Sequence, residues 1–275
     1  MDITTITSFR AARIRADLAL APGEVFIAGG TWLMSEPLPE TTGFVDLTTM
    51  GWPDLEVTAS GLRIGATCTI ARLVEWAQTA APAEWIAARR IIPDAANALL
   101  ASFKIWNTAT VGGNLCRTFA AGSMISLAVA LDGVAEVWTP DGTAYRLPVA
   151  ELPTGNGTHR LGPGEVLRAI ELPAHTLRSR AVLRKIALAE LGRSGAVVTG
   201  RVDEDGTSVF AITAATLVPV VRRFEGIPDA AELAASVASA PGYYTDVLGA
   251  ADWRRGVSIE FAERIRAELI AEDAS

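Results

Sequence analysis

Residues 105–115 read IWNTATVGGNL, and an apolar stretch follows them as far as residue 131. A second Gly-Gly pair lies in residues 26–31, FIAGGT, at the end of a short apolar run. Glycine pairs let a backbone turn with positive φ and approach a ligand closely, so that successive N–H groups face an anion such as a diphosphate. Thr31 and Asn114 add polar side chains beside these glycines. The two loops therefore predict a phosphate site held by amides and hydroxyls.

No nucleotide-binding string of the G-x-G-x-x-G or G-x-x-x-x-G-K-[ST] kind occurs anywhere in the chain. Taken alone, either Gly-Gly pair is more often a tight turn, because glycine is the commonest turn residue. Two such pairs, one after an apolar strand and one before an apolar helix, are more specific than either pair alone.

The segments around these loops predict a mixed α and β chain. Ser8 is expected to cap a helix that runs to Leu18, and Pro93 to precede a helix that runs to Leu100. Further helices are expected at 69–80 and within 115–131, where 124–131 is buried. Strands are expected at 25–28, 43–47, 62–66, 134–138, 144–147 and 165–172. After Pro173 the chain restarts at 178–189, with strands at 196–202 and 209–215 and helices at 230–237 and 257–272.

Length and composition are those of a globular chain that buries a large core. The chain has 275 residues, 50% of them hydrophobic, and a formal net charge of −7. We expect two domains with a boundary near residue 175. The acidic balance argues against nucleic-acid binding, and Arg89-Arg90 and Arg222-Arg223 are interpreted as solvated surface. Because no apolar run reaches the roughly 20 residues of a membrane span or the pattern of a signal peptide, we expect no transmembrane segment and a cytoplasmic location.

The chain has few groups for metal chemistry, with two cysteines, Cys68 and Cys116, and two histidines, His159 and His175. A zinc or iron-sulfur site would usually need about four such ligands, some of them closely spaced. We therefore expect no metal site here, two buried thiols and two surface histidines.

With these features together, the sequence resembles the FAD-binding medium subunit of the molybdenum hydroxylases, the family of carbon monoxide dehydrogenase and xanthine dehydrogenase. The resemblance runs over nearly the whole chain. It rests on the segments 26–31, 44–47, 62–66, 105–115 and 161–167, which occur in the family's order. It implies an α+β fold: a PCMH-type FAD-binding domain at 1–175, made of two α+β subdomains at about 1–54 and 55–175, and a smaller C-terminal α+β domain at 176–275.

The resemblance also implies which residues bind FAD. Both Gly-Gly loops would embrace its diphosphate, Leu161 would pack near the isoalloxazine ring, and Ser123 stands where the family often has an Asp that reaches the ribityl chain. A lysine over the flavin face corresponds to Arg184 or Lys185, and the sequence leaves the choice between them open. The implied cofactor-binding residues are Ile27, Ala28, Gly29, Gly30, Thr31, Trp32, Thr110, Gly112, Gly113, Asn114, Ser123, Leu161, Arg184 and Lys185.

Three positions depart from the family pattern. Trp32 stands where the family often has Asp, Trp106 where it usually has Arg, and Ser123 replaces the Asp named above. The loss of a carboxylate and a guanidinium should weaken the polar contacts to the flavin. Without the resemblance, Ser123 would be interpreted as an exposed serine at the start of a helix.

The function implied is electron transfer. The resemblance implies a molybdopterin-containing large subunit and a small subunit with two 2Fe-2S clusters as partners, in a dimer of heterotrimers. FAD in this chain would pass electrons to an external acceptor. Two alternatives remain open at this point: a scaffold subunit of the same complex that holds flavin poorly, and a stand-alone FAD-dependent oxidase. No catalytic side chain is expected in this chain.

Overall fold

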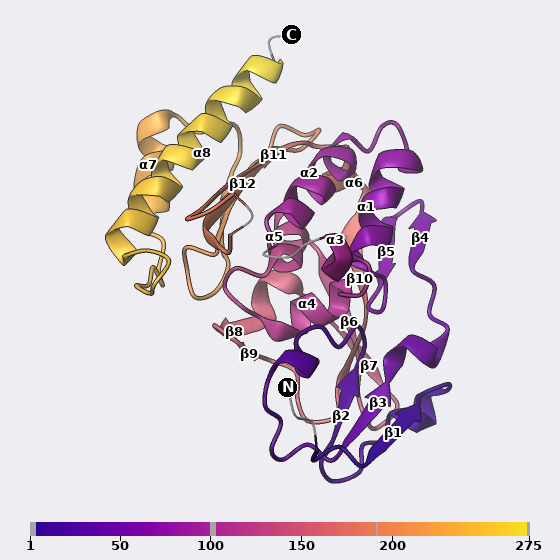
Figure 1. Ribbon diagram of the computed structural model, residues 1–275. Helices are drawn as coiled ribbons and strands as arrows, with labels where there is room; N and C mark the ends of the chain where they lie inside the picture. Colours follow the sequence, from indigo (N-terminus) through magenta and orange to yellow (C-terminus); the bar gives the residue numbers. More distant parts are fainter. Residues whose placement is uncertain (1–3, 100–102, 191, 274–275) are drawn as a thin grey trace.

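The computed structural model describes residues 4–99, 103–190 and 192–273. The described residues form three larger sheets that follow one another along the chain and one two-stranded sheet. Figure 1 shows a cluster of helices beside the second sheet and two helices on the outer face of the third. The chain is thus built from α and β elements in alternating groups.

The first sheet is small and parallel. It contains β1 (Ser8–Ala11), β2 (Glu24–Ile27) and β3 (Gly43–Asp46) in the order β1-β3-β2. The helix expected at 8–18 is wrong: residues 8–11 pair with β3, and only a 3-10 turn follows at Arg15–Leu18. Pairing with a distant strand overrides a local helix preference of this size. Further 3-10 turns occupy Leu33–Ser35 and Leu47–Met50.

The second sheet is antiparallel and forms the middle of the molecule. Its strands are β4 (Leu55–Thr58), β5 (Gly61–Gly65), β6 (Val134–Trp138), β7 (Ala144–Pro148) and β10 (Val166–Pro173), in the order β4-β5-β10-β6-β7. The hairpin of β6 and β7 is as the sequence predicts. A 3-10 turn (Val149–Glu151) leads to the short pair β8 (Pro153–Gly155) and β9 (Thr158–His159).

Two helices pack beside this sheet. α1 (Ile70–Thr79) begins as predicted, with the Thr69 hydroxyl accepting from the Arg72 amide at 3.2 Å. α2 (Ile86–Asn97) contains Pro93 in its interior, so the expectation that the helix starts after Pro93 is wrong. The buried face of α2, which includes Ile91 and Ile92, offsets the backbone hydrogen bond that the proline cannot donate. The expected end at Leu100 lies outside the described residues.

The apolar stretch after the second Gly-Gly pair forms two helices. α3 (Phe103–Trp106) precedes α4 (Val111–Arg117), and α5 (Ser123–Ala130) is buried along its whole length. Thr118, with φ 45°, ends α4 in the left-handed region and divides what the sequence presents as one helix. The glycine pair consequently lies inside the first turn of α4, whereas the sequence predicts it just before a helix.

The last hundred residues form a four-stranded antiparallel sheet with helices on one face. After α6 (Ala174–Arg178) come β11 (Arg180–Ala187), β12 (Ser194–Val202), β13 (Ser208–Thr213) and the unpredicted β14 (Val220–Phe224). α7 (Ala230–Ala238) and α8 (Ala251–Asp273) cover the face toward the upper left of Figure 1.

Neighbouring residues of β12 serve two cores. Val198 packs with α7 and α8, whereas Val197 joins the main core that contains α2 and α5. Buried Arg201 also spans the expected boundary, because its Nη1 donates to the Ala130 carbonyl at 2.6 Å. The third sheet is therefore packed onto the rest of the molecule, and the division into domains at residue 175 stays a prediction.

Two arginine pairs expected on the solvated surface take part in these contacts. Arg90 of α2 forms ion pairs with Glu268 and Glu272 of α8, and Arg223 pairs with Asp132 at 2.6 Å. Arg223 is exposed, as expected, whereas Arg90 is half-buried because α8 brings two carboxylates to it.

Candidate functional site

The main cavity of the described structure has a volume of about 730 Å³ and lies where the first sheet, α4 and β10 meet. This volume is within the range of sites that bind cofactors and other small molecules. Both Gly-Gly loops line it. The lining includes Ala28, Gly29, Gly30, Thr31, Trp32, Thr110, Gly112, Gly113, Asn114 and Leu161 from the sequence-predicted set.

The first loop leaves β2 at Ile27, and its backbone is open. Gly30 has φ +65°, a conformation that glycine adopts at little cost. Among the residues that the structure describes, no hydrogen bond engages the amide N–H groups of residues 29–32. A run of free amides after a strand, with a residue of positive φ inside it, forms a concave anion-binding surface.

The second loop differs. Thr110 caps α4, its hydroxyl accepting from the Gly113 amide at 3.0 Å and its carbonyl from the Asn114 amide at 3.0 Å. The Gly112 amide donates to the Ala66 carbonyl at 2.9 Å. The expectation of positive φ is wrong for Gly112 and Gly113, which are helical, and their amides are already paired.

At one glycine of each loop, Gly29 and Gly112, close packing rather than a positive φ requires glycine. A Cβ on Gly29 would lie 1.9 Å from the Thr108 carbonyl oxygen, so the first loop lies directly on the segment that leads into the second. A Cβ on Gly112 would lie 2.6 Å from the Cβ of Ala66. At Gly113 only the Thr110 hydroxyl is near, at 2.8 Å, and the rest of that space belongs to the cavity.

Asn114 and Ser123 connect α4 to α5. The Asn114 side-chain carbonyl accepts from the Met124 amide at 3.0 Å and so gives a hydrogen-bond partner to an amide in the first turn of α5. Ser123 is only 1% exposed, and its hydroxyl has no partner in the described part of the chain. The interpretation as an exposed serine is therefore wrong. A buried hydroxyl without a partner next to Gly122 of the cavity lining fits a site that a polar ligand completes.

Leu161 lies at the opposite wall, half-buried against the main core. The loop that carries it is fixed by Glu165, whose carboxylate accepts from the Gly162 amide and from the Tyr145 hydroxyl, both at 2.8 Å. Burial, together with this hydrogen bond, raises the pKa of Tyr145 to about 12. The Glu165 carboxylate therefore accepts hydrogen bonds from its own loop and from β7.

Two guanidinium groups that sequence reasoning missed, Arg117 and Arg193, also line the cavity. The Arg117 guanidinium carbon lies 5.1 Å from the centre of the Trp32 ring and 5.0 Å from that of Phe119. The Arg193 guanidinium lies 5.6 Å from the Phe119 ring. The signal is weak in the sequence, because Trp32 is distant from Arg117 and Phe119 is distant from Arg193.

Arg184 and Lys185, the two cations that the resemblance offers, are not among the lining residues. The Arg184 guanidinium forms an ion pair with Glu268 of α8. The Lys185 ammonium donates to the Asn97 carbonyl at 2.6 Å and to the Glu190 carbonyl at 3.1 Å. The structure therefore uses both in contacts between segments and does not bring them to the other predicted residues.

Of the three departures, Trp32 lines the cavity, whereas Trp106 does not. Trp106 packs against the main core, and its buried indole N–H has no partner within the described residues. Cys68 is buried as expected, whereas Cys116 is half-buried and lines the cavity; burial raises the pKa of both thiols to about 12, which disfavours the reactive thiolate. His159 is exposed, as expected, but contributes to the cavity wall.

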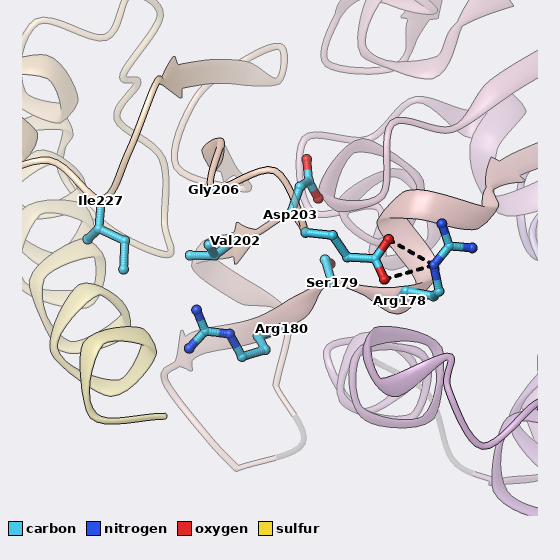
Figure 2. Close-up of a pocket in the computed structure, with 8 residues that line it drawn as sticks. Arg178, Ser179, Arg180, Val202, Asp203, Gly206 and Ile227 are labelled. Carbon is cyan, nitrogen blue, oxygen red and sulfur yellow. Dashed lines mark hydrogen bonds and ion pairs between the residues drawn. The ribbon is translucent and has the colours of Figure 1, made fainter. Parts of the chain in front are cut away.

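A second cavity, of about 390 Å³, lies between β11, β12 and the turn after β12 (Figure 2). Its charged groups are already used. Arg178 Nε donates to both carboxylate oxygens of Glu204, at 3.1 and 3.0 Å, and Arg180 Nη1 donates to the Leu269 carbonyl at 2.9 Å. Since the charged residues that line it in the described structure are paired with other parts of the chain, this cavity does not resemble a cofactor site.

Within the described residues, no helix is both long and apolar enough to span a membrane. Nor do these residues bring three or more His, Cys, Asp or Glu side chains together in a way that could hold a metal ion.

Comparison with known proteins agrees with the geometry. The family model of the FAD binding domain in molybdopterin dehydrogenase matches residues 7–175. A comparison with curated protein sequences found no match.

Several solved structures share the fold. Quinoline 2-oxidoreductase from Pseudomonas putida 86 matches with a TM-score of 0.79 and 20% identity, covering 95% of this chain and 96% of that one. Carbon monoxide dehydrogenase from Oligotropha carboxidovorans matches with a TM-score of 0.79 and 20% identity, covering 95% and 98%. The enzyme from Hydrogenophaga pseudoflava gives 0.76 and 17%, covering 94% and 95%. These matches confirm the predicted α+β fold.

Proposed function

The chain belongs to the family of the FAD-binding domain in molybdopterin dehydrogenases, and from this premise we propose that the main cavity is its FAD site. The observation that carries the proposal is the run of four unpaired amides at residues 29–32, which belong to the lining of the main cavity. Ser123 is not itself a lining residue, but its unpaired hydroxyl directly follows Gly122 of the same lining. A run of free donors beside a cavity of this size suits a long ligand with a diphosphate.

Each wall of the cavity has a distinct role in this proposal. The amides of residues 29–32 donate hydrogen bonds to the diphosphate, and Gly113 leaves the space beside them free of side-chain atoms. Ser123 donates to or accepts from the sugar-like chain of the ligand, and Leu161 presents an apolar surface to its ring system. Bound FAD supplies redox chemistry that no amino-acid side chain provides.

We further propose that the chain is the flavin-binding component of an oxidoreductase complex and passes electrons between its partners and an external acceptor. The family name and the shared fold support this. The matched structures include a carbon monoxide dehydrogenase described as lacking the Mo-pyranopterin part of its molybdenum cofactor. By analogy, partner subunits would hold the molybdenum cofactor and the 2Fe-2S clusters, and the expected dimer of heterotrimers and cytoplasmic location are parts of this proposal.

Uptake of FAD tests the first proposal. The purified chain should be yellow, or should take up added FAD with saturable quenching of flavin fluorescence. A folded chain that neither contains nor takes up FAD would favour the scaffold alternative. Substrate turnover by this chain alone would instead favour the stand-alone oxidase.

Co-purification tests the second proposal. A tag on this chain should capture two further subunits, and metal analysis of the complex should find molybdenum and iron. A chain that is isolated alone from its native source, with FAD but without either metal, would contradict the assignment to such a complex while leaving the FAD site intact.

A further inference from the structure

Arg117 occupies a distinctive place in the cavity. It is the last residue of α4, about one turn beyond Asn114, and it contributes to the cavity lining. Its Nε is buried without a hydrogen-bond partner, and no carboxylate forms an ion pair with it in the part of the chain that the structure describes. A guanidinium with five donors that are not committed elsewhere is suited to a ligand with several acceptor oxygens.

Two aromatic rings hold this guanidinium. Trp32 and Phe119 meet edge to face with their centres 4.7 Å apart, and the Arg117 guanidinium lies about equally far from both. Cation–π contacts at such distances orient the guanidinium plane without using its N–H groups. Because Trp32 belongs to the first loop and Arg117 to the helix of the second, this contact joins the two loops at the cavity.

The charges around Arg117 also favour an anionic ligand. A diphosphate carries two negative charges, whereas the amides of the first loop supply partial positive charge only and those of the second loop are already paired. Burial lowers the pKa of Arg117, and Glu36 only partly counteracts this effect. The buried positive charge therefore lacks full compensation within the chain, which an anionic ligand would supply.

We propose that Arg117, positioned by the Trp32 and Phe119 rings, is the cation that binds the diphosphate of the dinucleotide. This inference rests on the proposed FAD site.

Arg193 provides a matched control. It lines the same cavity and lies over the same Phe119 ring, but it comes from the segment before β12 and, among the described residues, makes no cation–π contact with Trp32. Arg117 is also in the last turn of its helix, where any cation is favourable for the helix itself. A ligand without phosphates separates this structural role from a role in binding the diphosphate.

The test compares FAD and riboflavin binding by fluorescence titration in the full chain and in the variants Arg117→Gln, Arg117→Lys and Arg193→Gln. Loss of a charge-assisted contact should weaken FAD binding by Arg117→Gln roughly ten- to hundred-fold. Arg117→Lys should weaken it less, Arg193→Gln should have the smallest effect, and riboflavin affinity should change by less than about twofold. If riboflavin binds too weakly to measure, competition by adenosine, which also lacks phosphates, takes its place, and its inhibition constant against FAD should change by less than about twofold in Arg117→Gln.

The dependence of FAD affinity on salt concentration gives a further measurement, which begins with the unaltered chain. FAD affinity of the unaltered chain should fall as ionic strength rises, and Arg117→Gln should reduce this dependence. Equal FAD affinity in Arg117→Gln and the parent, or an equal loss for riboflavin, would overturn the inference. A parent chain that takes up no FAD would instead contradict the proposed function itself, so the two failures are distinguishable.

Discussion

The two Gly-Gly loops look alike in sequence but have different roles in the structure. The first follows a strand, includes a glycine with φ +65° and leaves the amides of residues 29–32 unpaired. The second begins a helix, and its amides are paired with Thr110 and with the Ala66 carbonyl. The same dipeptide thus provides hydrogen-bond donors in one loop and mainly space in the other.

The residue two positions before each glycine pair explains this difference. Thr110 has a hydroxyl that caps the helix start and accepts from the amide of Gly113, whereas Ile27, at the same place before the first pair, has no polar side chain. In the proposed FAD site, phosphate binding at the first loop would therefore depend on backbone N–H groups, and at the second on the absence of a Cβ. Each prediction below changes one side of this comparison.

The largest effect is expected for Gly29→Ala. The new Cβ would lie 1.9 Å from the Thr108 carbonyl oxygen, so the two loops must separate. We expect a loss of about 3 kcal/mol of unfolding free energy and no measurable FAD binding. Thermal melts and FAD titration measure the two effects. Gly226→Ala, at a site with no atom within 4 Å, is the control; normal FAD binding by Gly29→Ala would show that the loops do not depend on this contact.

Gly113→Val should remove FAD binding while the chain still folds. Apart from the Thr110 hydroxyl at 2.8 Å, the valine would extend into the cavity, where the diphosphate is expected. Gly112→Ala is the counterpart, because its Cβ would meet Ala66 at 2.6 Å and should cost about 1–3 kcal/mol of stability. The ratio of bound FAD to folded protein distinguishes them, and a folded Gly113→Val variant with full flavin content would contradict the placement of the second loop.

Thr110→Ala should have a moderate effect on stability. Removal of the cap hydroxyl leaves the Gly113 amide without its partner and should lower the unfolding free energy by about 1 kcal/mol. Denaturant titration measures this, and Thr110→Ser, which keeps the hydroxyl, should restore most of it. FAD affinity should fall far less than in Gly113→Val, since the amide that is released faces the cavity. A loss of affinity as large as that of Gly113→Val would mean that the Thr110 side chain itself binds FAD.

The smallest effect concerns acid stability near the first loop. Arg10 donates to both carboxylate oxygens of Glu24, the first residue of β2, at 2.9 and 2.8 Å. This hydrogen-bonded contact, with a further bond from the Ala21 amide, lowers the pKa of Glu24 to about 2. Since the pKa is lowered on folding, the stabilisation is complete above the ordinary value of 4.5 and is lost as pH falls toward 2.

Glu24→Gln checks this contribution. The variant should lose about 0.2–1 kcal/mol at pH 7 and should differ progressively less from the parent between pH 4.5 and 2. Denaturant titrations across this range measure the difference. A constant difference between the two proteins at all these pH values would show that Glu24 acts through packing alone.

Local sequence signals predicted much of the fold. The strands at 43–46, 134–138 and 166–173 were expected within one or two residues, because apolar and β-branched runs bounded by Gly and Pro are strong signals. The Thr69 cap and the start of α1 were also expected. The failures at residues 8–11 and at Pro93 share one cause: partners distant in the chain, β3 and the core beneath α2, outweigh local preference.

The sequence by itself therefore determined that this chain has two glycine loops, few metal ligands and the family pattern of an FAD-binding domain. Only the tertiary structure decided which amides are free, that Ser123 is buried, and that Arg184 and Lys185 are held by other contacts. It also brought Arg117 against Trp32, a residue 85 positions earlier in the sequence (117 minus 32). The reason is physical: propensity and turn chemistry depend on neighbouring residues, whereas burial, pairing and charge compensation depend on atoms that only the folded chain brings together.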